Sequence, residues 1–263
     1  MKPATKTIAF LISLVASTAI YSQSPGLQLK KATNHPIQYL ISLPAGWSAK
    51  SRWPIVIVAS DAEKQFRKDA EQFITARKSL PFIIITPFIT TNGSQGHGDP
   101  SIYPYSKSVW DTIDKLTICK FDLDGLQSII KDVQKTYSGS DKVFITGFEA
   151  GAHLVWAMVF HHPELLYAAA PVAGNYRSRC METNAFSNDP SRAQIPIRSF
   201  TGSEDKDFGV KGKIYQQYLD AKALALAHGY RNISETEVQG KGHVLLPDEV
   251  LDNFNSVWKS IKN

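Results

Sequence analysis

One stretch of the sequence decides the fold: Val143-Phe144-Ile145-Thr146-Gly147-Phe148-Glu149-Ala150-Gly151-Ala152-His153. A β-branched, apolar run meets Gly-x-Glu-x-Gly, and a helix-forming segment follows. The pattern Gly-x-Ser-x-Gly between a strand and a helix is a sharp turn that exposes a serine at the top of a sheet. Gly147 and Gly151 keep the spacing of that turn, but Glu149 stands at its centre. We therefore expect the side chain of residue 149 to point from the sheet into a site.

The segments on either side of this turn alternate between strand and helix. Short apolar runs predict strands that are buried on both faces, and apolar residues at helical spacing predict helices. The expected strands are Leu27–Thr33, Pro36–Leu43, Pro54–Ala59, Phe82–Thr86, Lys142–Thr146, Tyr167–Val172, Ile195–Thr201 and Ile233–Val238. The expected helices are Glu63–Arg77, one that Asp122 caps and Gly139 ends, one from the turn to about His161, Val210–His228 and Pro247–Ile261. This alternation predicts an α/β fold, with a mostly parallel central sheet and helices on both faces.

The length and the first residues bound the organisation of the chain. With 263 residues, 43% of them hydrophobic, the chain is long enough for one large α/β domain. Residues 1–22 have the features of a secretory signal, because two lysines precede the apolar run Ile8–Ile20 and the small residue Ser22. Residues 23–263 then form a single domain. The run is short for a bilayer span, so we expect a secreted or periplasmic protein without a stable membrane anchor; an uncleaved anchor is the alternative.

The charge pattern argues against a nucleic-acid partner. The formal net charge is +5, and removal of Lys2 and Lys6 with the signal lowers it to +3. The remaining lysines and arginines are scattered along the chain instead of clustering on one periodic face, so no nucleic-acid footprint is present. The sequence does not indicate an oligomeric state.

Two cysteines fit an oxidising compartment. Cys119 and Cys180 are the cysteines of the chain, and we expect them to form a disulfide after export. The alternative is two separate buried thiols, because the sequence does not show that the residues lie within reach of each other.

The stretch from Pro87 to Lys120 interrupts the rhythm of strands and helices. It is long, contains several glycines and prolines, and carries Tyr103, Tyr105 and Trp110. We expect a functional surface loop. Its aromatic side chains either stack on a sugar or phenolic ring of a ligand or pin the loop onto the core, and the sequence leaves both alternatives open.

Two later residues complete a candidate constellation. On the scaffold that carries the Gly-x-Ser-x-Gly turn, an acid follows a later strand and a histidine follows the last one. Asp205 comes just after the strand that ends at Thr201, and His243 comes just after the strand that ends at Val238. We expect both to lie near residue 149. Glu204 and Asp207 are the alternatives for the acid.

Together these segments resemble a known family. Tyr39–Trp47, Phe121–Leu126, Ala170–Gly174, Thr201–Asp205 and Gly242-His243, with the central turn, are similar to those of secreted α/β-hydrolases of the feruloyl esterase, acetylxylan esterase and polyhydroxybutyrate depolymerase group. The resemblance covers nearly the whole mature chain. It implies hydrolysis of carboxylic esters, often on plant cell-wall polysaccharides, by a Ser, Asp and His triad without a cofactor. Asp205 is the implied acid and His243 the implied base, while Glu149 occupies the place of the nucleophile.

The turn before the first helix departs from this family as well. Its members usually follow that strand with His-Gly and small residues, whose backbone amides help to form the oxyanion hole. Here the strand ends in Ala59-Ser60-Asp61, without a glycine and with a carboxylate that would oppose a developing oxyanion. The amide of Ala150 remains as one expected donor.

These departures predict an esterase-like domain without serine-esterase activity. A carboxylate is a poor nucleophile toward an ester, because the tetrahedral adduct expels that carboxylate in preference to an alkoxide. We expect Glu149 and His243 to form an ion pair, and the domain to bind a carbohydrate or an aromatic ester. One alternative is an active hydrolase in which Glu149, His243 and Asp205 act on water or on an alkyl carbon. A second is that the three residues bind a metal, although their spacing is not specific for one and we expect none.

Overall fold

The computed structural model describes residues 26–181 and 186–262. The predicted signal, residues 1–22, lies outside the described residues. The strands are β1 (Gln28–Lys31), β2 (Gln38–Ser42), β3 (Trp53–Ala59), β4 (Ile83–Pro87), β5 (Gly139–Phe148), β6 (Leu166–Val172), β7 (Ile197–Gly202) and β8 (Ile233–Val238). The helices are α1 (Phe66–Arg77), α2 (Lys107–Leu116), α3 (Ile118–Thr136), α4 (Ala152–His161), α5 (Tyr215–Ala227) and α6 (Pro247–Lys262), with short 3₁₀ turns at η1 (Glu149–Gly151), η2 (Pro163–Leu165) and η3 (Pro190–Ala193).

The strands form one sheet in the order β1-β2-β4-β3-β5-β6-β7-β8. The pairs β1–β2 and β2–β4 are antiparallel, and all pairs from β4 to β8 are parallel. The expected mostly parallel sheet is confirmed. From β3 the chain proceeds first to β4 on one side and then to β5 on the other. The crevice at the carboxyl ends of β3 and β5 is therefore the topological switch point, where ligands bind in open α/β sheets.

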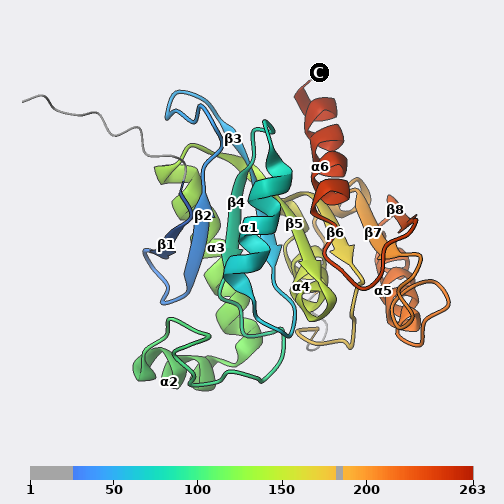
Figure 1. Cartoon of the computed structure of the whole chain (residues 1–263), viewed down its shortest axis with the longest axis horizontal. Helices are drawn as coiled ribbons and strands as arrows, with labels where there is room; N and C mark the ends of the chain where they lie inside the picture. The colour runs from blue at the N-terminus through green and yellow to red at the C-terminus, as the bar shows by residue number, and fades with distance from the viewer. Residues whose placement is uncertain (1–25, 182–185, 263) are drawn as a thin grey trace, which may run out of the picture.

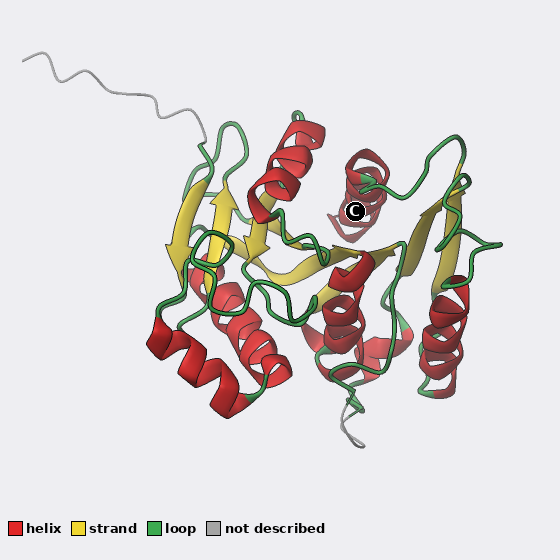
Figure 2. Cartoon of the chain, turned by 60° about the horizontal axis from the view of Figure 1, so that its bottom comes forward, coloured by secondary structure: helices red, strands yellow, loops and turns green. Residues whose placement is uncertain are grey.

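Helices cover both faces of the sheet, as predicted (Figure 1). Helices α1 and α6 pack together on one face, and α3, α4 and α5 lie on the other, with α2 against α3 (Figure 2). Alternate residues of β3 supply the two cores: Ile55 and Ile57 face the α3 and α4 side, whereas Val56 and Val58 face the α1 and α6 side. This is the two-residue period of a strand buried on both faces. Each such side chain contributes about 1.5–3 kcal/mol through burial.

The segment between β4 and α3, which we expected to be a functional surface loop, is not a loop throughout. It contains α2, and its aromatic residues are buried: Tyr103 is 1%, Tyr105 6% and Trp110 7% exposed. The Tyr103 and Tyr105 rings stack at 5.6 Å, and Trp110 meets both edge-on. The two hydroxyls donate hydrogen bonds to the Ile89 and Phe88 carbonyls, at 2.9 and 2.6 Å. The aromatic residues therefore pin the segment onto the core, the second of the two alternatives.

Asp122 does not cap a helix. Helix α3 begins four residues earlier than Asp122, at Ile118, where the side chain of Thr117 accepts a hydrogen bond from the Lys120 amide. Asp122 is fully buried inside α3, and its carboxylate accepts hydrogen bonds from the amides of Thr90 and Thr91, both at 2.7 Å. The residue ties α3 to the segment that follows β4. Burial raises the pKa of its carboxyl to about 6.

Other element boundaries differ from the prediction where non-glycine residues adopt left-handed backbone. Ser138, with φ 54°, follows the end of α3, so Gly139 begins β5 instead of ending the helix. A Cβ on Gly139 would lie 2.6 Å from the side chain of Ile55, so this position needs a glycine for close packing. Lys64, with φ 56°, delays the start of α1 to Phe66.

The start of α5 differs from the prediction for another reason. The helix begins at Tyr215 instead of Val210, after a series of turns that are held by backbone hydrogen bonds.

Cys119 and Cys180 are joined by a disulfide, with Cα atoms 5.2 Å apart. The bond links the first turn of α3 to the segment that follows β6. Within the described ranges, no helix is both long and apolar enough to cross a membrane.

The disulfide predicts a measurable loss of stability when it is removed. The bond closes a loop between residues 61 positions apart, and such a cross-link typically adds about 2–4 kcal/mol by restricting the unfolded chain. The double variant C119A/C180A should lose that amount in urea unfolding. A reductant should lower the free energy of unfolding of the wild type to that of the double variant, and it should leave the free energy of unfolding of the double variant unchanged. A double variant within about 0.5 kcal/mol of the wild type would contradict a stabilising bond.

Candidate functional site

The turn between β5 and α4 is sharp, and its backbone leaves no room for side chains at the two glycines. Glu149 follows β5 with φ 48°, opens η1, and precedes α4. A Cβ on Gly147 would lie 2.6 Å from the carbonyl oxygen of Gly151, and a Cβ on Gly151 would lie 2.2 Å from that of Ala59. Left-handed backbone at a residue such as glutamate is strained, and strain of this kind is typical of functional turns. The next residue, Ala150, is buried within η1.

The carboxylate of Glu149 lies against the turn after β3. The carboxylate oxygen Oε2 accepts a hydrogen bond from the backbone amide of Ala62 at 3.3 Å. The backbone carbonyl of Glu149 accepts one from the Asn175 amide, also at 3.3 Å. We expected an ion pair between Glu149 and His243, and this was wrong. Among the ion pairs within residues 26–181 and 186–262, none joins these two side chains. The carboxylate bonds to the amide of the neighbouring turn, while the imidazole bonds to a different acid.

That acid is Asp205, as the chain order suggested. His243 Nδ1 lies 2.8 Å from Asp205 Oδ2; the carboxylate side chain is 1% exposed, and the imidazole is 41% exposed. The other oxygen, Oδ1, accepts hydrogen bonds from the amides of Asp207 and Phe208, at 3.1 and 2.9 Å. A carboxylate on Nδ1 fixes the tautomer whose Nε2 is free to accept a proton, as in a catalytic dyad.

Two aromatic rings hold the imidazole in place. His243 stacks on Phe208, with ring centroids 4.6 Å apart, and the ring of Phe148 lies 4.7 Å away. Phe148 is the residue before Glu149, so the imidazole packs beside the turn even though it does not bond to the glutamate. The loops after β7 and β8 approach closely here, because a Cβ on Gly202 would lie 2.2 Å from the carbonyl oxygen of Lys241.

The turn after β3 carries two further acidic and polar groups. Ser60 is completely buried. Burial raises the pKa of the Asp61 carboxyl, and the nearby charge of Glu149 raises it further, although hydrogen bonds from the turn oppose the shift. The amide that faces Glu149 belongs to Ala62, a position that sequence reasoning missed. Only the packing of β3 beside β5, with Ala59 opposite Gly147, brings it there.

Asn92 and Lys64, also missed from the sequence, support this turn. The Asn92 side-chain amide donates to the carbonyls of Ser60 and Asp61, at 3.0 and 2.8 Å. Lys64 Nζ donates to Asn92 Oδ1 at 2.7 Å and to the Gly93 carbonyl at 3.0 Å. The burial of Lys64 lowers its pKa to about 8. These bonds occupy the carbonyls of the turn and hold it in one conformation.

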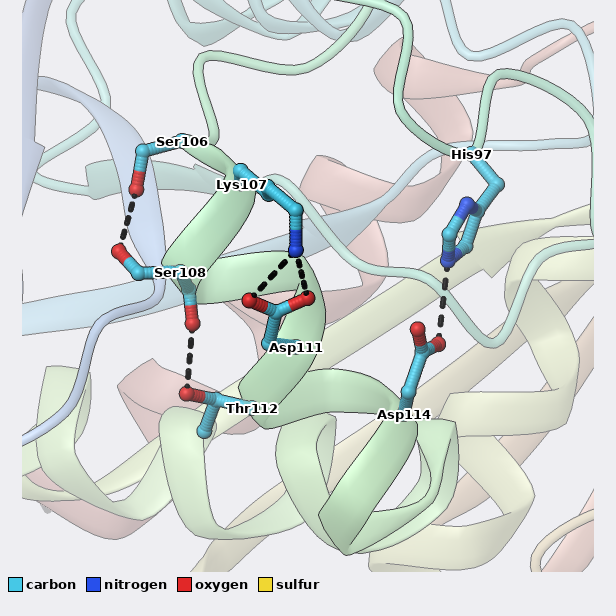
Figure 3. A network of polar contacts seen from close by, with 7 residues as sticks. All are labelled: His97, Ser106, Lys107, Ser108, Asp111, Thr112 and Asp114. Carbon is cyan, nitrogen blue, oxygen red and sulfur yellow. Dashed lines mark hydrogen bonds and ion pairs between the residues drawn. The ribbon is translucent and has the colours of Figure 1, made fainter.

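A cavity of about 350 Å³ is lined in part by Gly93, the residue after Asn92. Its lining residues are Thr90, Gly93, Ser94, Gln95, His97, Tyr103, Trp110, Ile118 and Arg179. Of the predicted aromatic candidates, Tyr103 and Trp110 line the cavity, whereas Tyr105 does not. His97 lies above α2 and pairs with Asp114 at 3.1 Å, while Lys107 and Asp111 pair on the same helix (Figure 3).

The metal alternative has no support in the geometry. Within the part of the chain that the structure describes, no group of three histidine, cysteine, aspartate or glutamate side chains is arranged to hold a metal ion. Glu149, Asp205 and His243 therefore do not form the ligand set considered from the sequence.

No protein-family model and no curated protein matches the chain. Solved structures do. A thermostable esterase matches with a TM-score of 0.56 at 15% identity over 89% of this chain; the match spans 62% of the length of that esterase. Poly(aspartic acid) hydrolase-1 of Sphingomonas sp. KT-1 matches with a TM-score of 0.62 at 13% identity, over 89% of this chain and 99% of its own. The poly(3-hydroxybutyrate) depolymerase LpqC of Bordetella parapertussis matches with a TM-score of 0.60 at 14% identity, over 89% of both chains.

At these identities the likeness shows the fold alone. The chain has the α/β-hydrolase fold, in agreement with the strand order, the parallel pairing and the helices on both faces. Similar structures include esterases and a polyester depolymerase.

The depressed pKa of Lys64 predicts a pH dependence of stability. The folded-state pKa of about 8 lies below the ordinary value of 10.5, so the unfolded chain binds more protons than the folded chain between these values. The wild type should therefore gain stability relative to K64M as the pH rises from 8 to 10.5. Urea unfolding from pH 7 to 10 measures this difference. The same comparison with K68M, which alters an exposed lysine, should be flat. If the difference in stability between the wild type and K64M did not change with pH, that result would contradict the effect of burial on the pKa of Lys64.

Proposed function

We propose that this protein is an exported, esterase-like α/β-hydrolase domain that binds a small-molecule or polysaccharide ester, or a related carboxylic ligand, without serine-esterase chemistry. One observation carries the proposal: the residue at the centre of the strained turn is Glu149, whose carboxylate bonds to the Ala62 amide and not to His243. The strained turn and the Asp205–His243 pair support an esterase-like site, and the residue at the centre of the turn has no hydroxyl to act as a nucleophile.

The chemistry of acyl transfer explains why this change matters. In the serine mechanism the histidine takes the hydroxyl proton as the oxygen attacks, and backbone amides receive the negative charge of the intermediate. Glu149 has no hydroxyl proton to give. If it attacked an ester, the adduct would expel the carboxylate again, because a carboxylate is a better leaving group than an alkoxide.

Besides the amide of Ala150, the amide of Ala62 faces the place of an oxyanion, and it is already engaged. Ala62 donates to Glu149 Oε2, and the Asp61 carboxyl lies in the same turn. A developing oxyanion would therefore meet an anion already in place and a second acidic group nearby. The loss of one such donor typically lowers turnover by about 10²–10³.

The proposed export rests on different observations. The lysines and the apolar run of residues 1–22 are typical of a secretory signal. The bond between Cys119 and Cys180 suits an oxidising compartment. Together they support a secreted or periplasmic location.

One observation favours a second candidate function. Glu149 Oε2 is held by an amide, and among the described residues no hydrogen-bond donor contacts Oε1. A carboxylate held in this way can attack an alkyl carbon with its free oxygen and displace a leaving group, which forms a glutamyl ester. Water then attacks that ester as His243 accepts its proton, and the alcohol leaves with Glu149 restored. Attack on an ester fails because the adduct expels the carboxylate again in preference to the alkoxide. This competition between two leaving groups does not arise when the carboxylate attacks an alkyl carbon.

Replacing Glu149 with serine tests the proposed function. E149S should react with a fluorophosphonate probe and slowly hydrolyse p-nitrophenyl acetate, because the Asp205–His243 pair is already formed. The wild type should do neither. The change frees the Ala62 amide, but the Asp61 carboxyl still lies in the same turn and opposes an oxyanion, so we expect turnover about tenfold or more below that of an ordinary serine esterase. E149S/H243A, the matched control, should lose the labelling.

Two results would overturn the binding-domain proposal. One is clear turnover of the ester by the wild type that E149A, H243A and D205N all abolish. The other is a covalent adduct on Glu149, detected by peptide mass after incubation of the wild type with alkyl halides or epoxides, which would establish the second candidate.

A further inference from the structure

Lys64 is a buried lysine without an acidic partner. The residue is 6% exposed, and no carboxylate of residues 26–181 or 186–262 forms an ion pair with it. Its Nζ donates instead to Asn92 Oδ1 at 2.7 Å and to the Gly93 carbonyl at 3.0 Å. Lysine is almost never buried without a paired charge, because an unpaired charge is costly to remove from water. A reaction that removed this charge would therefore be favoured.

The group that faces the amine is a side-chain amide held at both ends. Asn92 is completely buried, and its Nδ2 donates to the carbonyls of Ser60 and Asp61, at 3.0 and 2.8 Å. Its Oδ1 accepts the hydrogen bond from Lys64. Because Cγ carries Oδ1, the amine lies close to the amide carbon, and atoms held at roughly 3–3.5 Å are placed for reaction. The amine and the amide are thus fixed beside each other without solvent between them.

The surroundings favour attack of the amine on the amide. Burial lowers the pKa of Lys64 to about 8, so part of the amine is uncharged at neutral pH and can act as a nucleophile. The Tyr103 hydroxyl lies 3.5 Å from Asn92 Oδ1, where it can donate to that oxygen as negative charge develops. Burial also raises the pKa of the Asp61 carboxyl, which makes this side chain a better proton donor.

We propose that Lys64 and Asn92 become joined by an intramolecular isopeptide bond. Nζ of the uncharged lysine attacks Cγ of Asn92, the bond between Cγ and Nδ2 breaks, and Nδ2 leaves as ammonia. The proton that Nζ loses passes to the leaving nitrogen, and the Asp61 carboxyl carries it. The reaction needs no oxidant, reductant or cofactor. Its product is a neutral amide in place of a buried charge.

The bond would join the turn before α1 to the segment after β4. It goes beyond the proposed function and does not rest on it, because neither Glu149 nor His243 takes part. Its effect on the candidate site is to fix the turn after β3, whose carbonyls Asn92 already holds. The pH dependence predicted for Lys64 belongs to freshly folded protein, since the nitrogen of an amide does not titrate in that range.

Mass spectrometry of the folded wild type tests the bond. After incubation at pH 9, above the pKa of Lys64, the protein should be lighter by one ammonia molecule. A tryptic digest should contain one branched peptide that joins Lys64 to Asn92, and trypsin should no longer cleave after Lys64. The digest is essential, because a glutamine at the amino terminus of an exported chain also loses ammonia. Protein kept unfolded in urea should not form the branched peptide.

Four variants identify the reacting groups. N92D should form the same bond with loss of water instead of ammonia, and K64R, which keeps a donor at this place, should form none. K68M, which alters an exposed lysine of α1, should react like the wild type. D61N should slow the reaction by about 10²–10⁴, the usual contribution of a group that transfers a proton. Thermal unfolding of each variant checks that it is folded.

Three outcomes would overturn the inference. The first is the absence of a branched peptide from both the folded wild type and N92D. The second is a loss of ammonia at Asn92 that K64R retains, which would identify a succinimide formed with the backbone amide of Gly93. The third is a branched peptide that forms equally fast in urea, because the reaction would then not depend on the folded site. Reaction of D61N at the rate of the wild type would exclude Asp61 as the proton carrier.

Discussion

The structure depends on a close backbone contact between β3 and the turn that follows β5. Gly151 lies so near the Ala59 carbonyl that a Cβ would come within 2.2 Å of it. This contact makes the turn sharp, brings Glu149 to φ 48°, and starts α4 directly against the sheet. Because β3 and β5 are neighbours at the switch point, the same contact places residue 149 beside the turn that carries Ala62. The position of the glutamate is thus a property of the backbone, whatever side chain stands there.

The same geometry explains why the carboxylate bonds to an amide and not to the imidazole. The Ala62 amide lies across the short gap between β3 and β5, on elements that the sheet holds rigidly. His243 lies on the loop after β8, where Asp205 and the rings of Phe148 and Phe208 already fix it. Opposite charge alone predicted a Glu149–His243 pair, but charge does not move an imidazole that packing and a buried acid hold elsewhere. The sequence could not reveal this competition, since it involves four segments distant in the chain.

Sequence patterns predicted the parts of the fold that depend on local periodicity. The apolar run of β5, the alternation of strands with helices and the two glycines of the turn were readable because their physical causes lie within a few residues. The errors occurred where non-glycine residues take left-handed backbone, as at Lys64 and Ser138, and where a side chain has a distant partner. Asp122 resembles a helix cap, but its partners are the amides of Thr90 and Thr91. Arg179 and Asn92 carry no local signal, and only the tertiary fold gives them a place beside the candidate site.

The Asp205–His243 pair does not by itself require catalysis. Asp205 accepts hydrogen bonds from the Asp207 and Phe208 amides, so it organises the loop after β7 whether or not the histidine reacts. His243 in turn fills the space between Phe148 and Phe208 beside the turn. Removing His243 would leave the buried carboxylate of Asp205 without its partner and a gap between the two rings. Removing Asp205 would leave the Asp207 and Phe208 amides without their acceptor. A buried unpaired polar group costs about 1–3 kcal/mol. The two residues therefore have structural roles whatever side chain stands at position 149, and their geometry would be available to a hydroxyl placed on that turn.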